Sequence, residues 1–233
     1  MNTTHASLAD RIAHTRARIA AAAARSGRSA SAVTLVAVVK TRAAEVVAEA
    51  VRLGLTDLGE NRVQEAQAHQ QVVPRDAARW HLIGHLQRNK AGKAPGLFDV
   101  VHSVDDLELA TALARRCREA GRVMPVMVEV NVSGEASKFG VRPESLGELL
   151  EGLATLDGIE LRGLMTVPEA VDQPDEARAA FARLRELRDA GAARLGRPLP
   201  ELSMGMSGDY EVAVEEGATI VRVGSALFGA RGA

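Results

Sequence analysis

The feature that most constrains the fold of this chain is a repeated alternation between short apolar segments and amphipathic segments. Eight segments have the length and composition of strands, and each precedes a segment of helical or near-helical pattern. Strands that alternate with helices indicate parallel pairing through βαβ units. Several of the eight are continuous apolar runs, as expected where both faces of a sheet are covered. The predicted strands are 33–39, 57–61, 80–84, 97–103, 123–131, 159–166, 199–205 and 219–223.

Eight such units in 233 residues are typical of one closed (β/α)8 TIM barrel. An open, doubly wound sheet is the alternative. A further helix over 7–26, which Ser7 and Asp10 begin with the pattern of a capping box, is expected to pack outside the barrel. No linker rich in Pro, Gly or Ser divides the chain, so residues 1–233 are predicted to form a single domain.

Composition argues against several classes of function. A net charge of −1 gives no overall field that would attract nucleic acid or an anionic membrane, and 3% aromatic residues leave little material for base stacking. No signal-peptide pattern and no apolar run of ~20 residues is found, so we expect a cytoplasmic protein.

The residues that commonly bind metals do not form a convincing site. The single cysteine, Cys117, excludes an internal disulfide and a thiolate-rich metal centre, and we interpret it as a core residue. His81 and His85 have the i, i+4 spacing of a metal pair on a helix. They flank a predicted strand end and Gly84, however, so no metal site is predicted.

The first predicted strand ends at Lys40, one of four lysines in the chain. In barrels of this kind, active sites lie at the carboxyl ends of the strands. A lysine at an apolar barrel mouth is partly desolvated, which favours the neutral amine, and a neutral amine can form a Schiff base with an aldehyde or ketone. The alternative is that Lys40 extends into solvent at a strand end.

Two loops near the end of the sequence have the pattern of a phosphate site. Ser207 lies between glycines just before a predicted helix, and Gly224 and Ser225 follow the last strand. Backbone N–H groups at helix starts bind anions, and barrels often bind phosphate in the loops after strands seven and eight. The alternative is that these glycines only form tight turns. An amine opposite a phosphate cradle suggests a phosphorylated aldehyde, and pyridoxal 5′-phosphate (PLP) has both groups.

Arg222 interrupts the last apolar strand on the same face as Ile220. An arginine that projects into a barrel needs a partner. A pyridine nitrogen could accept a hydrogen bond from this side chain, and such pairing would make the ring a weaker electron sink because arginine stays protonated. The alternative is a structural ion pair with a carboxylate such as Glu129.

Several sequence blocks together resemble one known family. They are "VAVVKT", "LGENRVQEA", "WHLIGHLQRNK", "VEVNVSGEASKFGV" and, most specifically, "ELSMGMSGDYEVAVEEGATIVRVGSALFGAR". From about residue 8 to Arg231 the chain resembles the pyridoxal phosphate homeostasis proteins (the YggS/PROSC family). Val39, Arg62, Phe139, Gly208 and Tyr210 depart from the residues common in that family.

The resemblance implies a barrel like the alanine racemase N-terminal domain, the fold type III of PLP proteins, without the second β domain of the enzymes. It implies that Lys40 holds PLP as an internal aldimine. It also implies that Ser207, Gly224 and Ser225 hold the phosphate, that Arg222 faces the pyridine nitrogen and that Asn61 lies near the cofactor. Members of this family are thought to buffer, carry or deliver PLP inside cells, with apo PLP-dependent enzymes as the recipients.

Two enzymatic alternatives remain open from the sequence. A PLP-dependent racemase or decarboxylase of fold type III would need a lid and a second proton carrier, and the chain has one tyrosine, Tyr210. A Schiff-base aldolase would use Lys40 but leaves Arg222 less explained. We therefore expect a PLP carrier without a dedicated substrate, as a monomer, with a dimer as the alternative.

Overall fold

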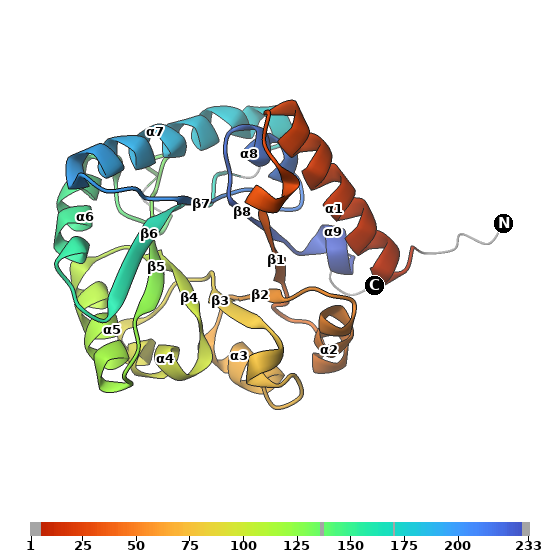
Figure 1. Ribbon diagram of the computed structural model, residues 1–233, viewed down its shortest axis with the longest axis horizontal. Helices are drawn as coiled ribbons and strands as arrows, with labels where there is room; N and C mark the ends of the chain where they lie inside the picture. Colours follow the sequence, from red (N-terminus) through yellow and green to blue (C-terminus); the bar gives the residue numbers. More distant parts are fainter. Residues whose placement is uncertain (1–5, 136–137, 170, 230–233) are drawn as a thin grey trace.

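The computed structural model of the protein describes residues 6–135, 138–169 and 171–229. Eight parallel strands close into one barrel in the order β1 to β8, with β8 paired to β1 (Figure 1). The prediction of a closed barrel is confirmed, and the open sheet is excluded. The strands are β1 (Thr34–Val38), β2 (Asp57–Glu60), β3 (Arg79–Leu82), β4 (Val100–Val104), β5 (Met124–Glu129), β6 (Ile159–Met165), β7 (Glu201–Ser203) and β8 (Ile220–Val223).

Helices follow the strands and surround the ring (Figure 1). After the third strand, the sequence "LQRNKAGKA" (86–94) predicts a helix. The structure instead has a 3-10 helix over Arg88–Lys93 before the short helix α4, because Gly92 and Pro95 are poor residues for a continuous α-helix. The helices are α1 (Leu8–Arg25), α2 (Ala44–Arg52), α3 (Val63–His69), α4 (Ala94–Leu97), α5 (Leu107–Glu119), α6 (Leu146–Ala154), α7 (Arg178–Leu195), α8 (Tyr210–Glu215) and α9 (Ser225–Phe228).

Two layers of apolar side chains form the core. The larger layer lies between the strands and the helices, and it includes the buried Cys117, as predicted. The smaller layer fills the inside of the barrel. Because successive strand residues point to opposite faces, Val221 and Val223 join the outer layer while Ile220 lies inside. The interior apolar residues are Val36, Val100, Met127, Met165 and Ile220.

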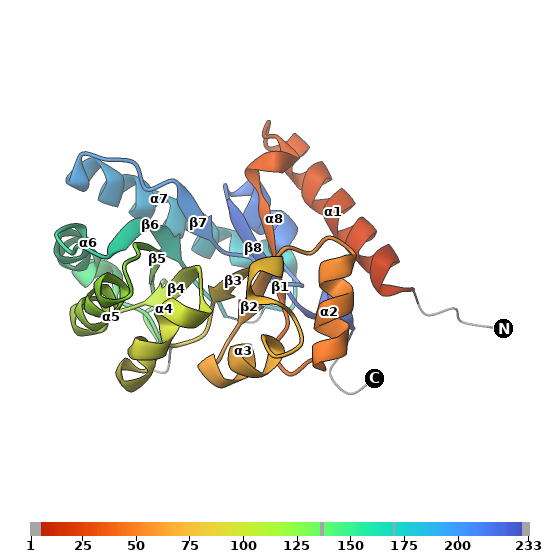
Figure 2. The ribbon, with the colours of Figure 1, turned by 60° about the horizontal axis from the view of Figure 1, so that its bottom comes forward.

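The N-terminal helix α1 packs against α8 and α9 on the outside of the barrel (Figures 1 and 2). Its predicted capping box is confirmed, because Asp10 N–H donates to Ser7 Oγ over 3.1 Å and Ser7 N–H donates to Asp10 Oδ2 over 3.0 Å. These two contacts satisfy backbone donors that the first helical turn would otherwise leave free.

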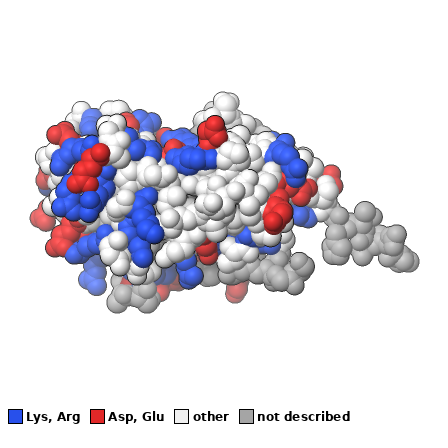
Figure 3. All heavy atoms as spheres, turned by 90° about the horizontal axis from the view of Figure 1, so that it is seen from below, with Lys and Arg blue, Asp and Glu red and all other residues white. Residues whose placement is uncertain are grey.

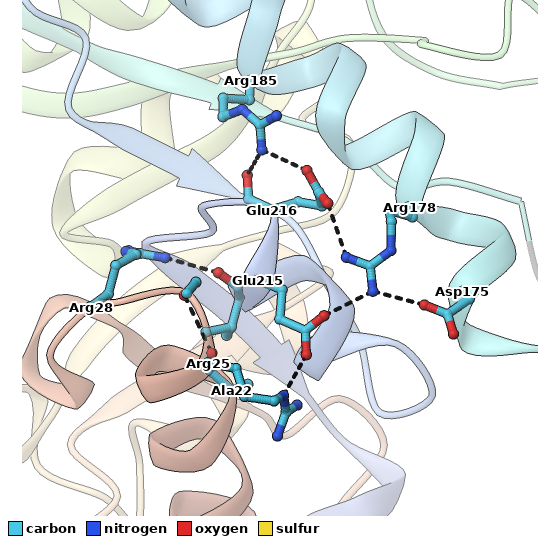
Figure 4. A network of polar contacts seen from close by, with 10 residues as sticks. Ala22, Arg25, Arg28, Asp175, Arg178, Arg185, Glu215 and Glu216 are labelled. Carbon is cyan, nitrogen blue, oxygen red and sulfur yellow. Dashed lines mark hydrogen bonds and ion pairs between the residues drawn. The ribbon is translucent and has the colours of Figure 1, made fainter.

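Ion pairs anchor the end of α8 to its neighbours (Figure 4). Arg178 on α7 donates to Glu215 over 2.8 Å and to Glu216 over 3.0 Å, and Arg25 on α1 donates to Glu215 over 2.7 Å. These pairs are partly exposed, so each adds little by itself, but together they link three helices. They hold α8 in place, and the loop before α8 carries Ser207.

The charged surface mixes both signs. On the face drawn in Figure 3, Lys and Arg side chains alternate with Asp and Glu, and uncharged surface separates the groups. Across the described residues, no helix combines the length and apolar character that crossing a membrane requires.

Strands β6 and β7 approach closely at Gly163. A Cβ atom added there would overlap the carbonyl oxygen of Glu201, so any side chain must separate the two strands.

We predict that Gly163→Ala lowers the free energy of unfolding by about 3 kcal/mol, measured by urea denaturation. Gly96→Ala is the matched control, because a Cβ atom added at Gly96 would meet no other atom within 4 Å. Equal stability of both variants and the wild type would contradict this account.

Candidate functional site

A pocket of about 460 Å³ opens at the carboxyl ends of β1, β2 and β8 and at the loop after β7. Its volume lies within the range of small-molecule sites. The structure brings all six sequence-predicted site residues to this one pocket. They are Lys40, Asn61, Ser207, Arg222, Gly224 and Ser225.

Lys40 follows β1 in a tight turn at the pocket wall. Val39 N–H donates to Gly59 O over 3.0 Å, which extends the β1–β2 pairing to the residue before the lysine. Arg42 N–H donates to Val39 O over 3.1 Å and closes the turn. Thr41, between them, has a φ of 62°, which is strained for a β-branched residue. Such strain persists only where neighbouring contacts fix the backbone, and it occurs often at functional sites.

Side-chain contacts of Arg42 supply part of that constraint. Its guanidinium lines the pocket and donates to the carbonyl oxygens of Phe228, over 3.2 Å, and Gly229, over 2.6 Å. These bonds tie the turn after β1 to the end of α9. Sequence reasoning missed Arg42, because arginine is abundant in this chain and its partners are backbone atoms.

His69 on α3 holds the same turn from the other side. One ring nitrogen contacts the buried carboxylate of Glu60, and Nε2 lies 2.8 Å from Arg42 O. Burial raises the pKa of Glu60, and the hydrogen bond to Glu60 raises the pKa of His69. The Nε2–H group can therefore donate to Arg42 O while the other nitrogen contacts Glu60, which fixes the backbone two residues after Lys40.

Asn61 reaches the pocket because β3 passes close to its backbone. A Cβ atom on Gly84 would lie 2.5 Å from Asn61 O, so only glycine permits this approach. Ser103 Oγ donates to Gly84 O over 2.7 Å and holds the end of β3 in place. Asn61 itself is half-buried at the pocket wall.

The loops after β7 and β8 meet at Ser207. Its Oγ accepts hydrogen bonds from Gly224 N–H, over 3.1 Å, and from Ala226 N–H, over 3.2 Å. Gly205 begins the first loop with a φ of 92°, a conformation that favours glycine. Because the Ser207 oxygen accepts two bonds, its own proton is available to an acceptor in the pocket. Gly208 and Ser225 are exposed beside it. The two loops therefore bring the hydroxyl groups of Ser207 and Ser225 to the pocket.

Arg222 projects from β8 into the barrel, as the alternation of the strand predicts. It is 3% exposed, and it donates to Ser203 Oγ over 2.7 Å and to Thr166 O over 2.8 Å. Both acceptors are uncharged, and no carboxylate of the described residues lies within ion-pair distance. The alternative prediction, a structural ion pair between Arg222 and Glu129, is therefore wrong. Burial lowers the pKa of Arg222 to about 10, so the guanidinium stays protonated near neutral pH.

Glu129 lies buried at the end of β5 without such a pair. Burial raises its pKa to about 7, the charge of Asp105 adds to this shift, and the charge of Arg222 opposes it. The carboxyl can therefore gain or lose a proton near neutral pH. Sequence reasoning treated Glu129 only as a partner for Arg222.

The two histidines with metal-like spacing point to different partners. His81 is buried and contacts Asp57 and His102, whereas His85 lies 3.5 Å from Asp105 and stacks on Phe139. Within the described ranges no group of three or more His, Cys, Asp or Glu side chains is arranged to hold a metal.

Comparisons with known proteins show which family the chain resembles. The family model for the alanine racemase N-terminal domain matches residues 9–232. A protein of Pseudomonas aeruginosa named "pyridoxal phosphate homeostasis protein" is 47% identical, over 96% of each chain. A protein of that name from Aquifex aeolicus is 42% identical, over 95% of this chain and 97% of its own.

Among solved structures, PipY of Synechococcus elongatus with PLP bound is 36% identical. It superimposes with a TM-score of 0.84 over 96% of this chain and 100% of its own. Sequence and structure thus agree over nearly the whole length of both proteins. The chain belongs to the family of pyridoxal phosphate homeostasis proteins, which is built on the alanine racemase N-terminal domain.

Proposed function

We propose that this protein binds PLP in the pocket at the barrel mouth and acts in PLP homeostasis by holding and releasing the cofactor. The observation that carries the proposal is the meeting of three kinds of group in one pocket. These are the amine of Lys40, the donor loops around Ser207 and the buried guanidinium of Arg222. The names of the relatives and the PLP bound to PipY support the choice of ligand.

The residues present fit PLP group by group. When bound, PLP supplies an aldehyde that condenses reversibly with an amine, and Lys40 is the amine that lines the pocket. Ser207 and Ser225 offer hydroxyl groups to a phosphate, and Gly224 lines the same side of the pocket. Asn61 offers an amide at the pocket wall.

Arg222 suits the ring nitrogen of such a ligand. A guanidinium has five N–H donors, and two bonds to neutral acceptors leave donors free for the pocket that the side chain lines. Because Arg222 donates and does not accept, it would keep a facing pyridine nitrogen unprotonated. An unprotonated ring withdraws electrons weakly, so this arrangement favours storage of the cofactor over catalysis.

The wider role follows from these properties. We propose that the single barrel of residues 1–233 is the PLP-binding unit and that it works as a monomer in the cytoplasm. Apo PLP-dependent enzymes are the proposed recipients of the cofactor. Exchange between Lys40 and the amine of another protein requires that the pocket be reachable, and Lys40 is half-buried rather than enclosed.

One observation favours a second candidate function, weak proton transfer on amino acids. Glu129 has a pKa of about 7, which suits a group that exchanges protons near neutral pH. Tyr210, the single tyrosine, does not serve this purpose, because it is 2% exposed and packs under Arg18 of α1. Glu129 is not among the residues that line the pocket, so this second function has less support than storage of PLP.

The first prediction concerns Lys40. Wild-type protein incubated with PLP and reduced with borohydride should carry one phosphopyridoxyl group on Lys40, located by peptide mass spectrometry. Lys40→Ala should lose this adduct, because it lacks the pocket amine. Lys93→Ala is the matched control and should keep it, since Lys93 is exposed and contacts Gln67. An unlabelled wild type, or label retained in Lys40→Ala, would reject the assignment.

The second prediction tests whether Ser207 contributes to binding of the phosphate group rather than to binding of the rest of the ligand. Ser207→Ala removes a donor to the phosphate, so we expect roughly tenfold weaker binding of PLP by fluorescence titration. Binding of pyridoxal, which has no phosphate, should change by less than about twofold on the same scale. Ser31→Ala, at an exposed site in the 3-10 helix before β1, is the control. Equal losses for both ligands would point to a damaged pocket instead.

The third prediction distinguishes carrier from enzyme. PLP-loaded protein incubated with L-alanine in D₂O should incorporate deuterium at Cα no faster than free PLP does, as followed by proton NMR. The expected reason is the weak electron withdrawal that Arg222 enforces. Fast exchange in the wild type that disappears in Glu129→Gln would instead establish proton transfer through Glu129.

A further inference from the structure

A chain of hydrogen bonds crosses the interior of the barrel and ends on Arg222. It joins side chains from five strands, and each contact lies within ordinary hydrogen-bond distance. The distances are 3.0 Å for Asp57 Oδ1 to His81 Nε2, 2.9 Å for His81 Nδ1 to His102 Nε2, 2.8 Å for His102 Nδ1 to Ser203 Oγ, and 2.7 Å for Ser203 Oγ to Arg222 Nη1.

The chain connects the two ends of the barrel. Asp57 is the first residue of β2, so it lies at the end opposite the pocket, and its side chain is 22% exposed. His81, His102 and Ser203 are buried. Arg222, at the other end of the chain, lines the pocket. None of the first four residues lines that pocket, so the proposed binding of PLP gives them no role.

The two ends of the chain fix the direction of every bond. A guanidinium only donates, so Ser203 Oγ accepts from Arg222. A carboxylate only accepts, so His81 Nε2–H donates to Asp57. If both histidines are neutral, one arrangement satisfies all contacts between them. Ser203 O–H donates to His102 Nδ1, and His102 Nε2–H donates to His81 Nδ1.

The surroundings keep both histidines neutral. Burial lowers the pKa of His102 well below its usual value, and the charges of His81, Arg222 and Arg79 act in the same direction. Burial also lowers the pKa of His81, against opposing contributions from Asp57 and Asp99. Protonation of both rings would place two N–H donors face to face across the 2.9 Å contact, so the geometry disfavours two charged histidines.

We infer that Asp57, His81, His102 and Ser203 are positioning residues that orient Arg222 for its ligand. This inference rests on the proposed function. Each donor in the chain points toward Asp57. Ser203 Oγ therefore turns its lone pairs toward the buried guanidinium, and the hydrogen bond that Ser203 donates to His102 polarises this oxygen and strengthens its contact with Arg222. The chain helps to stabilise the Arg222 charge, together with the charges of Glu129 and Asp209, and it leaves the remaining N–H groups for the pocket.

The first test needs no cofactor. In protein with ¹⁵N-labelled histidine, two-bond proton–nitrogen NMR spectra report which ring nitrogen carries the proton. The chain requires His81 and His102 to be neutral and protonated on Nε2 from about pH 6 to pH 8. A proton on Nδ1 of either ring, or a charged ring in that range, would overturn the inference whether or not the protein binds PLP.

The second test measures PLP. Asp57→Ala and Ser203→Ala should each weaken PLP binding at least about fivefold and shift the absorbance maximum of bound PLP, because Arg222 loses its oriented support. Asp57→Asn keeps an acceptor and should retain most of the affinity. Glu160→Ala is the matched control, since Glu160 opens onto the same end of the barrel but pairs with Arg162 over 3.0 Å.

The outcomes separate the two claims. Wild-type affinity and an unchanged spectrum in both Asp57→Ala and Ser203→Ala would overturn the inference and leave the proposed function intact. A wild type that does not bind PLP would reject the proposed function, while the NMR result would still decide the direction of the chain. Because Asp57 lies at a partly exposed rim, its variants should fold even if changes at Ser203 impair folding.

Discussion

The closure of eight parallel strands is the constraint on which the site depends. Closure places the carboxyl end of every strand on one rim, so residues far apart in sequence meet there. Lys40 and Ser207 approach the same pocket only because β8 pairs with β1 and completes the ring. The close approaches at Gly163 and Gly84, where no Cβ atom fits, occur between neighbouring strands of this ring. The closed ring of strands thus determines both how the strands pack and where the pocket lies.

The second constraint is the burial of a positive charge. Arg222 is enclosed within the barrel, and its direct partners are a hydroxyl and a carbonyl oxygen. A buried cation without an ion pair is costly unless hydrogen bonds satisfy it. The oriented chain to Asp57 supplies one of these hydrogen bonds, and the charges of Glu129 and Asp209 also favour the protonated guanidinium. Because no carboxylate pairs with Arg222 directly, its remaining N–H groups stay available to a ligand.

Sequence patterns predicted the fold well because the apolar pattern of a strand and the amphipathic pattern of a helix are each set by residues close in sequence. All eight strands lie within a few residues of their predicted bounds, and Ser7 caps the first helix as its spacing with Asp10 indicated. The six predicted site residues could be grouped because strand order in a barrel fixes which loops are neighbours. The sequence pattern could not predict which side chains from different strands lie within hydrogen-bond distance of each other. Two contacts depend on how side chains pack across the ring. They are the hydrogen bond between His81 and His102 and the hydrogen bond from Arg42 to the backbone of Phe228.

A crystal structure of the protein soaked with PLP tests the central claim most directly. The account predicts continuous electron density between Lys40 Nζ and the cofactor, with the phosphate against Ser207 and Gly224 and the ring nitrogen facing Arg222. Cofactor bound elsewhere on the surface, or a ring turned so that Arg222 keeps no contact with its nitrogen, would contradict it.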